Sequence, residues 1–533
     1  MRLGIDVGGT NTDAVILDED DRLLAKGKTP DTEDVITGIE RVVARVVQDA
    51  GVDPRDITHA MLGTTQVTNA IIERRGLARV GILRLGAPAT KAIRPLAAWP
   101  EDLRAGVEGP AEILPGGVEY DGRPISGFDE AAVRQAVRGM KDEVGAFAVS
   151  SVFSPVKSDD ERRTAEIIVD EAGEQTPVSV SSEIGSIGLL ERENATVLNA
   201  AVTSVARRVV GAFQGALERL GINAQLFLSQ NDGTLMALDY ALRYPILTIA
   251  CGPTNSIRGA AFLSGMGDAV VVDVGGTSTD VGVLGAGFPR ESAVAVEIGG
   301  VQTNFRMPDL VSVGLGGGSI VRPNGAQDAV RVGPDSVGYA ITEEALCFGG
   351  STLTMTDVAV VRGLADVGDP GRVEAARGTV DAAYERSVAM FEEAVDRMKT
   401  SAEEVPVIAV GGGSILLPEK LPGVSRVHKP DHYEVANAVG AAIAQVSGTI
   451  DRVFSLAERS REEVMEEARR MARDFAAKSP LVMQLARDSF MRANDFEYRR
   501  AIENVVETIC NIIETDDAQE GLNAFNEKRP PNW

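Results

Sequence analysis

The hydrophobic pattern of the chain contains one arrangement twice: an apolar run, a turn of glycine and small polar residues, and a second apolar run. Residues 6–13 read DVGGTNTD and lead into AVIL, and residues 273–280 read DVGGTSTD and lead into VGVL. Seven of the eight positions agree, although the two copies lie 267 residues apart. Apolar runs on both sides of a glycine turn predict a β-hairpin, so we expect two related hairpins.

Between the two copies, the spacing of apolar residues alternates between the 3.6-residue period of a helix and the two-residue period of a strand. Apolar residues at 35, 36, 39, 42, 43, 46 and 47 predict a helix over 35–50. The proline- and glycine-rich residues 86–125 are expected to form an irregular insertion. Strands and helices are predicted in alternation at 78–85, 129–141, 145–153, 159–173 and 177–182. This alternation indicates an α/β fold.

The recurrence of the hairpin divides the chain into two related halves and a tail. A long helical pattern over 189–220 connects the halves, a strand near 225–228 follows it, and a helix of small residues is expected from about 251 to Gly265. We therefore predict three parts, with bounds at 1–188, 189–458 and 459–533.

The residue types of the hairpins suit a polyphosphate. Turn glycines leave backbone N–H groups uncovered and threonine hydroxyls add donors. The aspartate at the end of each first strand can bind Mg²⁺, directly or through water. The phosphate-binding candidates are Gly8, Gly9, Thr10, Gly275, Gly276 and Thr277; the metal candidates are Asp6 and Asp273; the catalytic candidates are Asp6, Asp273, Thr10 and Thr277. A single copy is also compatible with an ordinary glycine turn, and the second copy favours two halves that close on one polyphosphate.

Asp13 and Asp280 follow the two turns, and two roles are open for them. Each is either a second partner of the metal or a carboxylate that caps the turn, and we favour the capping role slightly.

Three further polar loops follow predicted strands. The loop of Gly411, Gly412, Gly413 and Ser414 exposes bare backbone against which a base or ribose can lie, so it is the candidate nucleoside site. Thr64, Thr65 and Asn69 lie where a strand meets a helix, a place that favours an anion or a carbonyl oxygen. Threonine capping of a surface helix is the alternative there. Gly316 and Gly317, in a third loop, are also assigned to the substrate side.

Composition narrows the function classes. The net charge of −25 in 533 residues argues against nucleic acid or an anionic membrane as the main partner. The three cysteines are far apart and form no CxxC pair, so neither a disulfide framework nor a cysteine zinc site is indicated. Pro430 separates His428 from His432, which favours loop histidines over a metal site.

No signal peptide or membrane-length apolar run is present, so we expect a cytoplasmic protein. P-loop, GxGxxG, GxSxG and HExxH motifs are also absent.

The combination of motifs resembles the hydantoinase/oxoprolinase family, in particular its A-type members, within the actin/hexokinase/Hsp70 nucleotide-binding superfamily. The resemblance covers about residues 1–460, and the residues that carry it are 4–10, 63–76, 273–280, 314–319 and 437–442. It implies two RNase H-like halves around a nucleotide cleft, with ATP and Mg²⁺ as cofactors. Two loops depart from the family pattern: SGPAGGV is here CGPTNSI at 251–257, and a GGAGP-like loop is here GGGS.

The activity that the resemblance implies is the ATP-dependent hydrolysis of a cyclic amide, such as a hydantoin or 5-oxoproline. ATP phosphorylates the amide oxygen, and water then attacks the activated carbon. Because the hydrolytic step in this family often belongs to a second subunit or half, the chain is expected to be the activating subunit of a homo- or hetero-oligomer with a B-type partner.

The tail has a different character. Ser460 and Glu463 form a capping box that opens one helix, Ser479-Pro480 opens a second, and a third is expected over 496–514. From about Arg469 the tail resembles the C-terminal helices of the enoyl-CoA hydratase (crotonase) family, through residues 477–481, 514–521 and 525–530. The strands and oxyanion-hole loops of that family are missing, so hydratase activity does not follow. The tail is either a helical fragment suited to self-association or to packing on the main body, or a fusion made in assembling the gene.

Two other functions are compatible with the same nucleotide site. A small-molecule kinase, for example of a sugar, needs a carboxylate base beside the acceptor hydroxyl, and the sequence singles out none. A nucleotide-switched scaffold predicts slow ATP turnover that small molecules do not change and that a polymer or client protein does.

Overall fold

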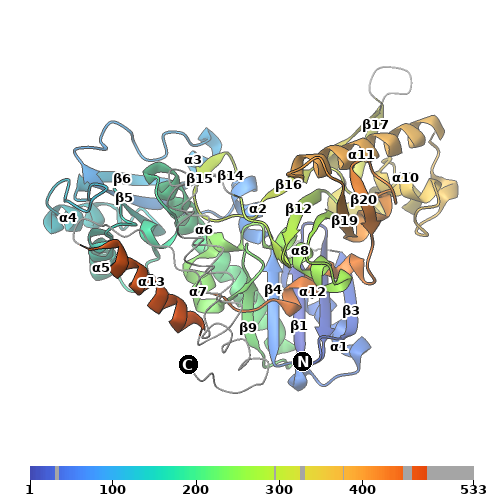
Figure 1. Cartoon of the computed structure of the whole chain (residues 1–533), viewed down its shortest axis with the longest axis horizontal. Helices are drawn as coiled ribbons and strands as arrows, with labels where there is room; N and C mark the ends of the chain where they lie inside the picture. Colours follow the sequence, from blue (N-terminus) through green and yellow to red (C-terminus); the bar gives the residue numbers. More distant parts are fainter. Residues whose placement is uncertain (31–34, 293–295, 324–329, 376, 448–458, 477–533) are drawn as a thin grey trace. The chain divides into compact units, whose positions relative to one another are not determined.

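The computed structural model describes residues 1–30, 35–292, 296–323, 330–375, 377–447 and 459–476 (Figure 1). The chain forms two compact units, Met1–Val446 and Ser447–Trp533. In the described part of the second unit there is one helix, α13 (Arg461–Ala476). Among the described helices, none has both the length and the apolar character that a membrane crossing requires.

The first sheet has six strands in the order β10-β9-β4-β1-β2-β3. β1 and β2 pair as the predicted antiparallel hairpin, whereas β1 with β4 and β4 with β9 are parallel pairs. The strands are β1 (Arg2–Val7), β2 (Asn11–Leu17), β3 (Leu23–Pro30), β4 (His59–Thr64), β9 (Gln225–Ser229) and β10 (Leu235–Ala237). Each buried strand here is apolar over most of its length, as expected of a sheet that is covered on both faces.

The second sheet repeats this plan. β11 and β12 form the second predicted hairpin, and β11 with β19 and β19 with β20 are parallel pairs. The strands are β11 (Ala269–Val274), β12 (Thr279–Gly285), β13 (Phe288–Pro289), β16 (Leu310–Val313), β19 (Val405–Val410) and β20 (Val424–His428). In both sheets the first strand of the hairpin therefore pairs with a parallel strand on its other edge, and that strand pairs with a second parallel strand. This shared order confirms the prediction of two related hairpins.

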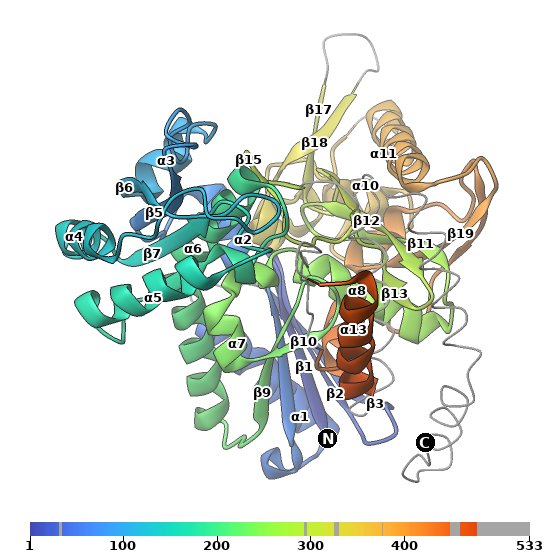
Figure 2. The same ribbon diagram turned by 60° about the vertical axis from the view of Figure 1, so that its left-hand side comes forward.

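A third sheet of four parallel strands, in the order β6-β5-β7-β8, lies within the first half of the sequence (Figure 2). Apolar residues of α4 and α5 pack against it, and α6 packs on β7. The elements are β5 (Val80–Ala87), α3 (Glu101–Val107), β6 (Glu108–Pro115), α4 (Glu130–Met140), β7 (Ala146–Ser151), α5 (Asp159–Ala172), β8 (Val178–Val180) and α6 (Leu189–Arg219).

The expectation of an irregular insertion over 86–125 is wrong in part, because α3 and β6 lie in it. The glycine and prolines that suggested a loop have a structural reason in β6. This strand is at the edge of its sheet, where proline is tolerated. A Cβ atom at Gly109 would lie 2.5 Å from the carbonyl oxygen of Val80, so the close approach of β6 to β5 requires glycine.

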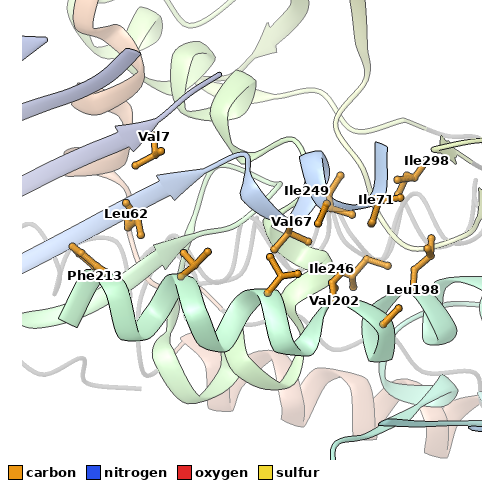
Figure 3. Packing of buried hydrophobic residues seen from close by; sticks show 14 of the residues in the cluster. Val7, Leu62, Val67, Ile71, Leu198, Val202, Phe213, Ile246, Ile249 and Ile298 are labelled. Atoms are coloured by element: carbon orange, nitrogen blue, oxygen red, sulfur yellow. The ribbon is translucent and has the colours of Figure 1, made fainter. Parts of the chain in front are cut away.

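The long helix expected over 189–220 is confirmed as α6, and the helix expected over 35–50 is α1 (Val35–Ala50). Figure 3 shows Leu198, Val202 and Phe213 of α6 directed toward Val67 and Ile71 of α2 and toward the first sheet. The other helices are α2 (Gln66–Glu73), α7 (Leu238–Arg243), α8 (Cys251–Ser264), α9 (Ile341–Glu344), α10 (Met355–Val361), α11 (Arg377–Met398) and α12 (Ala436–Ile443). Two small hairpins are β14 (Val296–Ile298) with β15 (Val301–Thr303) and β17 (Ser319–Pro323) with β18 (Val330–Ser336).

The first sheet takes residues from both sides of position 188. β9 and β10 join it after α6, and α12 packs on β1 and β2. The domain bounds at 1–188, 189–458 and 459–533 stay a prediction. In the first sheet, strands from before and after residue 188 lie side by side.

Helices α8 and α12 cross at very short distance between the two sheets. A Cβ atom at Gly259 of α8 would lie 1.8 Å from the carbonyl oxygen of Ala436, and one at Gly440 of α12 would lie 1.8 Å from that of Asn255. Gly4 of β1 is also in close contact, with its Cβ position 2.3 Å from the carbonyl oxygen of Ala438. The absence of side chains at these glycines lets the backbones of α8, α12 and β1 pack directly on one another.

We predict that Gly440→Ala lowers the free energy of unfolding by about 3 kcal/mol, because the new methyl group must displace backbone rather than a flexible side chain. Urea unfolding of the full chain, followed by circular dichroism, measures this. The matched control is Gly139→Ala, a helical glycine of α4 with nothing within 4 Å of its Cβ position. That change is expected to be neutral or to stabilise by up to about 1 kcal/mol. Equal effects of the two variants would contradict the close crossing.

Candidate functional site

The turns of the two hairpins have the same internal hydrogen bond. The amide of Gly8 donates to the carbonyl oxygen of Asn11 (3.1 Å), and that of Gly275 donates to Ser278 (2.9 Å). The next two amides of each turn donate to no acceptor in the described part of the chain; they belong to Gly9, Thr10, Gly276 and Thr277. Two adjacent free N–H groups in each turn form the kind of backbone cradle that binds phosphate oxygens.

The structure brings the two turns together. A Cβ atom at Gly276 would lie 2.8 Å from the hydroxyl oxygen of Thr10, so the second turn contacts the first. The loop that contains Gly316 and Gly317 packs behind the second turn. The amide of Gly317 donates to Gly275 (3.0 Å), and that of Gly318 donates to Gly276 (2.7 Å). Gly317 and Gly318 thus hold the second turn by hydrogen bonds, and Gly316 packs on Gly276, where a Cβ atom would lie 2.6 Å from the carbonyl carbon. The assignment of Gly316 and Gly317 to the substrate stays a prediction.

Asp6 is buried and held by two amide groups. The Nδ2 atom of Asn255 donates to its Oδ1 (3.2 Å), and that of Asn437 donates to its Oδ2 (3.0 Å). Burial raises the pKa of Asp6 to about 7, and the charges of Asp13 and Asp273 also raise it, while the two amide hydrogen bonds oppose the shift. A cation that binds here relieves this cost, because it stabilises the ionised carboxylate.

Asp273 occupies the matching place in the second hairpin. The hydroxyl of Ser256 donates to its Oδ2 (2.5 Å). Burial raises the pKa of Asp273, and the Ser256 hydrogen bond and the charge of Lys28 oppose this. Asp6 and Asp273 therefore occupy matching places on β1 and β11, each close to a turn in which two amides have no acceptor in the described structure.

The second aspartates of the hairpins lie opposite the first across the strand pairs, Asp13 opposite Asp6 and Asp280 opposite Asp273. Asp13 is paired with Lys28 (2.7 Å). Asp280 accepts a hydrogen bond from Ser312, and burial with the charge of Asp273 raises its pKa to about 6.

The capping role that we favoured for Asp13 and Asp280 is wrong, because in the described structure no turn amide donates to either carboxylate. Their hydrogen bonds come from neighbouring elements, namely from Lys28 on β3, Asn437 on α12 and Ser312 on β16. Side chains of a strand project from the faces of the sheet, so these carboxylates meet groups that lie on the same face rather than the amides of the turn.

Gly63 within β4 and Gly411 directly after β19 leave space for the side chains of Asp6 and Asp273. A Cβ atom at Gly63 would lie 2.2 Å from Oδ1 of Asp6, and one at Gly411 would lie 2.2 Å from Oδ1 of Asp273. Gly411 also has a φ of +83°, which side chains rarely adopt. The predicted nucleoside loop therefore lies against the second phosphate turn.

The rest of that loop forms the short 3₁₀ helix Gly412–Leu416. A Cβ atom at Gly413 would lie 2.7 Å from the carbonyl oxygen of Gly275. Ser414 is fully buried, and its hydroxyl has no partner in the described structure. An unpaired buried hydroxyl is costly, which fits a loop that gains a polar ligand.

Thr64, the last residue of β4, and Thr65 both make hydrogen bonds with backbone groups nearby. Thr64 is buried and accepts a hydrogen bond from the amide of Gln66 (3.2 Å), while the Thr65 hydroxyl donates to Val7 (3.3 Å). Asn69 Nδ2 lies 3.5 Å from that hydroxyl. Thr65 is the N-cap of α2 by position but makes no capping hydrogen bond with its side chain. Thr64, Thr65 and Asn69 lie beside the first hairpin, and their contact with substrate stays a prediction.

Cysteine and histidine do not build a metal centre in the described ranges, where no group of three or more His, Cys, Asp or Glu is placed to hold an ion. Cys251 is buried beside Thr64, and burial raises its pKa to about 12. His432 lies 3.0 Å from Lys26. Cys510 lies outside the described residues.

The residues present fit Mg²⁺ bound with a nucleotide. Mg²⁺ takes oxygen ligands and keeps several waters, so one or two carboxylates with phosphate oxygens are sufficient. Asp6 and Asp273 supply the carboxylates, and the two turns supply unpaired N–H groups for the phosphates.

Sequence reasoning missed five groups that hold the aspartates, namely Lys28, Asn255, Ser256, Ser312 and Asn437. Asn255 and Ser256 lie within 251–257, the loop at which the chain departs from the family pattern. The departure of this loop from the family pattern was the sequence signal that could have pointed to Asn255 and Ser256. Lys28 is found only through the strand register, which places it opposite Asp13.

Comparison with known proteins agrees with the fold. Two hydantoinase/oxoprolinase profiles match, that of the N-terminal region over residues 2–172 and the main one over 192–369. The chain is 28% identical over 397 residues to the acetophenone carboxylase gamma subunit of Aromatoleum aromaticum, covering 68% of this chain and 53% of that protein. It is 27% identical over 392 residues to the alpha subunit of caprolactamase from Pseudomonas jessenii, covering 68% and 55%. The chain thus spans about half the length of the curated relatives it matches.

Two solved structures are similar. The ATP-dependent caprolactamase of Pseudomonas jessenii has a TM-score of 0.65 at 22% identity, covering 84% of this chain and 71% of that one. A nucleotide-free acetone carboxylase has a TM-score of 0.64 at 20% identity, covering 83% and 70%. These similarities show a mixed α/β fold.

The tail matches a different family. An enoyl-CoA hydratase/isomerase profile covers residues 407–533, and 97 residues are 29% identical to a probable mitochondrial enoyl-CoA hydratase of Dictyostelium discoideum, covering 18% of this chain and 33% of that protein. The structure assigns residues up to 446 to β19, β20 and α12 of the first unit. The capping box is confirmed, because Ser460 and Glu463 exchange side-chain and amide hydrogen bonds. The second and third predicted tail helices lie outside the described residues.

The raised pKa of Asp6 predicts how stability depends on pH without metal. Between about pH 4 and pH 7 the folded chain keeps a proton that the unfolded chain releases, so the free energy of unfolding falls as the pH rises. Asp6→Asn removes this contribution, which is on the order of 3 kcal/mol across the range. Thermal unfolding in EDTA from pH 4.5 to 7.5 is expected to show a shallower slope in the variant.

Asp396→Asn, at an exposed position of α11, is the control and is expected to keep the wild-type slope. Parallel slopes for wild type and Asp6→Asn would contradict a proton held at Asp6.

Proposed function

The chain belongs to the hydantoinase/oxoprolinase family, and on that premise we propose that it uses ATP and Mg²⁺ to phosphorylate the carbonyl oxygen of a cyclic amide, such as a hydantoin or 5-oxoproline. The product is an activated intermediate that water opens. The names of its relatives, which include a caprolactamase and ketone carboxylases, are consistent with activation of a carbonyl group.

One observation carries the proposal: the two matching glycine turns contact each other, and each has an aspartate of its first strand beside it, the buried Asp6 and the half-buried Asp273. The Cβ position of Gly276 is 2.8 Å from the Thr10 hydroxyl, so the two turns are close enough to bind one polyphosphate together. Asn255 and Ser256 of α8 hold Asp6 and Asp273 by hydrogen bonds.

The proposed roles follow from position. The amides of Gly9, Thr10, Gly276 and Thr277 orient the phosphates, with Gly8 and Gly275 shaping the turns. Asp6 and Asp273 would hold Mg²⁺, which when bound neutralises charge on the transferring phosphate. The loop Gly411–Ser414 would hold the nucleoside. Thr64, Thr65 and Asn69, with Gly316 and Gly317, would face the acceptor.

The chemistry balances in two steps. The amide oxygen attacks the γ-phosphorus, the bond from that phosphorus to the bridging oxygen breaks, and ADP leaves. In the second step a water attacks the activated carbon, the C–N bond breaks and the ring nitrogen leaves as an amine, and another water hydrolyses the resulting acyl phosphate to a carboxylate and inorganic phosphate. An amide is a poor electrophile because of resonance, and phosphorylation converts its oxygen into a leaving group.

We assign the second step to a B-type partner in a homo- or hetero-oligomer. The curated relatives are themselves subunits of larger enzymes, as their names state. Location in the cytoplasm and a separate role for the tail stay predictions.

ADP release with Mg²⁺-ATP tests the function, with matched panels of cyclic amides, ketones and sugars. Stimulation by a hydantoin or 5-oxoproline supports the proposal, and ring-opened product with or without a partner shows whether one chain is sufficient. Stimulation only by ketones would move the acceptor to the chemistry named in the carboxylase relatives. Stimulation only by sugars would make the chain a kinase, and indifference to all three panels would favour a nucleotide-switched scaffold.

Asp273→Asn tests the two-hairpin site. We expect it to abolish nucleotide turnover, by about 100-fold or more, because it removes a carboxylate that acts on the transferring phosphate. Circular dichroism and the unfolding temperature are expected to show a folded chain. The control is Asp396→Asn on the surface of α11. Turnover at the wild-type rate in Asp273→Asn would contradict the site.

A further inference from the structure

The two aspartates of the site are held by neighbouring residues of one helix. Asn255 of α8 donates to Asp6 in the first hairpin, and Ser256, the next residue, donates to Asp273 in the second. Successive residues of a helix point about 100° apart, so one turn of α8 reaches both sheets. No other described residue donates to Asp273 through its side chain.

The placement of Asn255 is fixed from several sides. Its amide also donates to Ser229 (3.1 Å), at the end of β9. Gly440 of α12 packs on its backbone carbonyl, where a Cβ atom would lie at 1.8 Å. Because its side chain and its backbone are both held, Asn255 keeps a narrow range of positions.

Asn437 of α12 completes the arrangement on the side of the first hairpin. Its Nδ2 atom donates to Asp6 (3.0 Å) and to Asp13 (2.8 Å), and its Oδ1 accepts from the amide of Ala438 (2.8 Å). One amide thus joins two carboxylates that repel each other, and it does so from the first turn of α12.

We propose that Asn255, Ser256 and Asn437 are positioning residues for phosphoryl transfer, which set the orientation of both aspartates and, through α8, their separation. The inference rests on the proposed function of the same site. Each hydrogen bond occupies one side of a carboxylate and directs its other lone pairs. In Asp273 the donor is on Oδ2, and Oδ1 is left facing Gly411.

The consequence is that a mutation at Ser256 acts through Asp273 rather than through the nucleotide. Loss of a hydrogen bond to a charged group is expected to lower kcat for ATP turnover by about 10- to 100-fold. The KM for ATP should change less than about threefold, because the turn amides that hold the phosphates are unchanged.

The experiment compares Ser256→Ala, Ser256→Thr and Ser264→Ala in the full chain. Ser264 is the matched control, because its hydroxyl lies on the same helix and donates to the backbone of Ala260. The measurements are kcat and KM for ATP, and the affinity for Mn²⁺ with ADP by electron paramagnetic resonance. A purely structural role for Ser256 would not move the Mn²⁺ affinity at a temperature well below unfolding.

We expect Ser256→Ala to lower kcat and to weaken Mn²⁺ binding about 10-fold, Ser256→Thr to restore both, and Ser264→Ala to change neither. Wild-type kcat and Mn²⁺ affinity in Ser256→Ala, or the same losses in Ser264→Ala, would overturn the inference.

The proposed function and the positioning role can be contradicted independently of each other. A wild-type chain without ATP turnover would overturn the proposed function, and the Mn²⁺ measurement would still decide the role of Ser256. Asn437→Ala is a second variant on the other hairpin, and it is expected to weaken Mn²⁺ binding in the same direction. An unchanged Mn²⁺ affinity in Asn437→Ala would remove Asn437 from the positioning group.

Discussion

The crossing of α8 and α12 is the constraint on which the rest of the structure depends. Each helix reaches the backbone of the other at a glycine, Gly259 in α8 and Gly440 in α12. This contact brings the second turn of α8 and the first turn of α12 beside the hairpins, so their polar side chains reach Asp6 and Asp273. With larger residues at the crossing the helices would separate, and the two halves of the site would move apart with them.

The site is assembled at an electrostatic cost. Four carboxylates of the two hairpins gather between the sheets, and burial raises the pKa of Asp6, Asp273 and Asp280. Lys28, Ser312 and the amides of α8 and α12 offset part of this cost. Such an arrangement is stable enough to fold and still gains from a bound cation, a combination that is common at functional sites.

Much of the architecture was predictable because it is local. The duplicated DVGGT turn specifies both hairpins, and the apolar periodicity of 35–50 and 189–220 specifies α1 and α6. β6 was not predictable, since its glycine and prolines are explained only by its edge position and by its approach to Val80. The partners of the aspartates were also hidden, because Asn255 and Ser256 lie about 250 and 17 residues from the carboxylates they bind. Contacts of this kind follow from the fold and leave little trace in local sequence.

The most direct test of the central claim, that both hairpins hold one Mg²⁺-nucleotide, is hydrogen–deuterium exchange with and without a non-hydrolysable ATP analogue and Mg²⁺. The amides of Gly9, Thr10, Gly276 and Thr277 have no partner in the described structure, so they exchange fast in the free chain. The account predicts that peptides over both turns become protected together, and only when Mg²⁺ is present. Protection of one turn alone, or of neither, would contradict it.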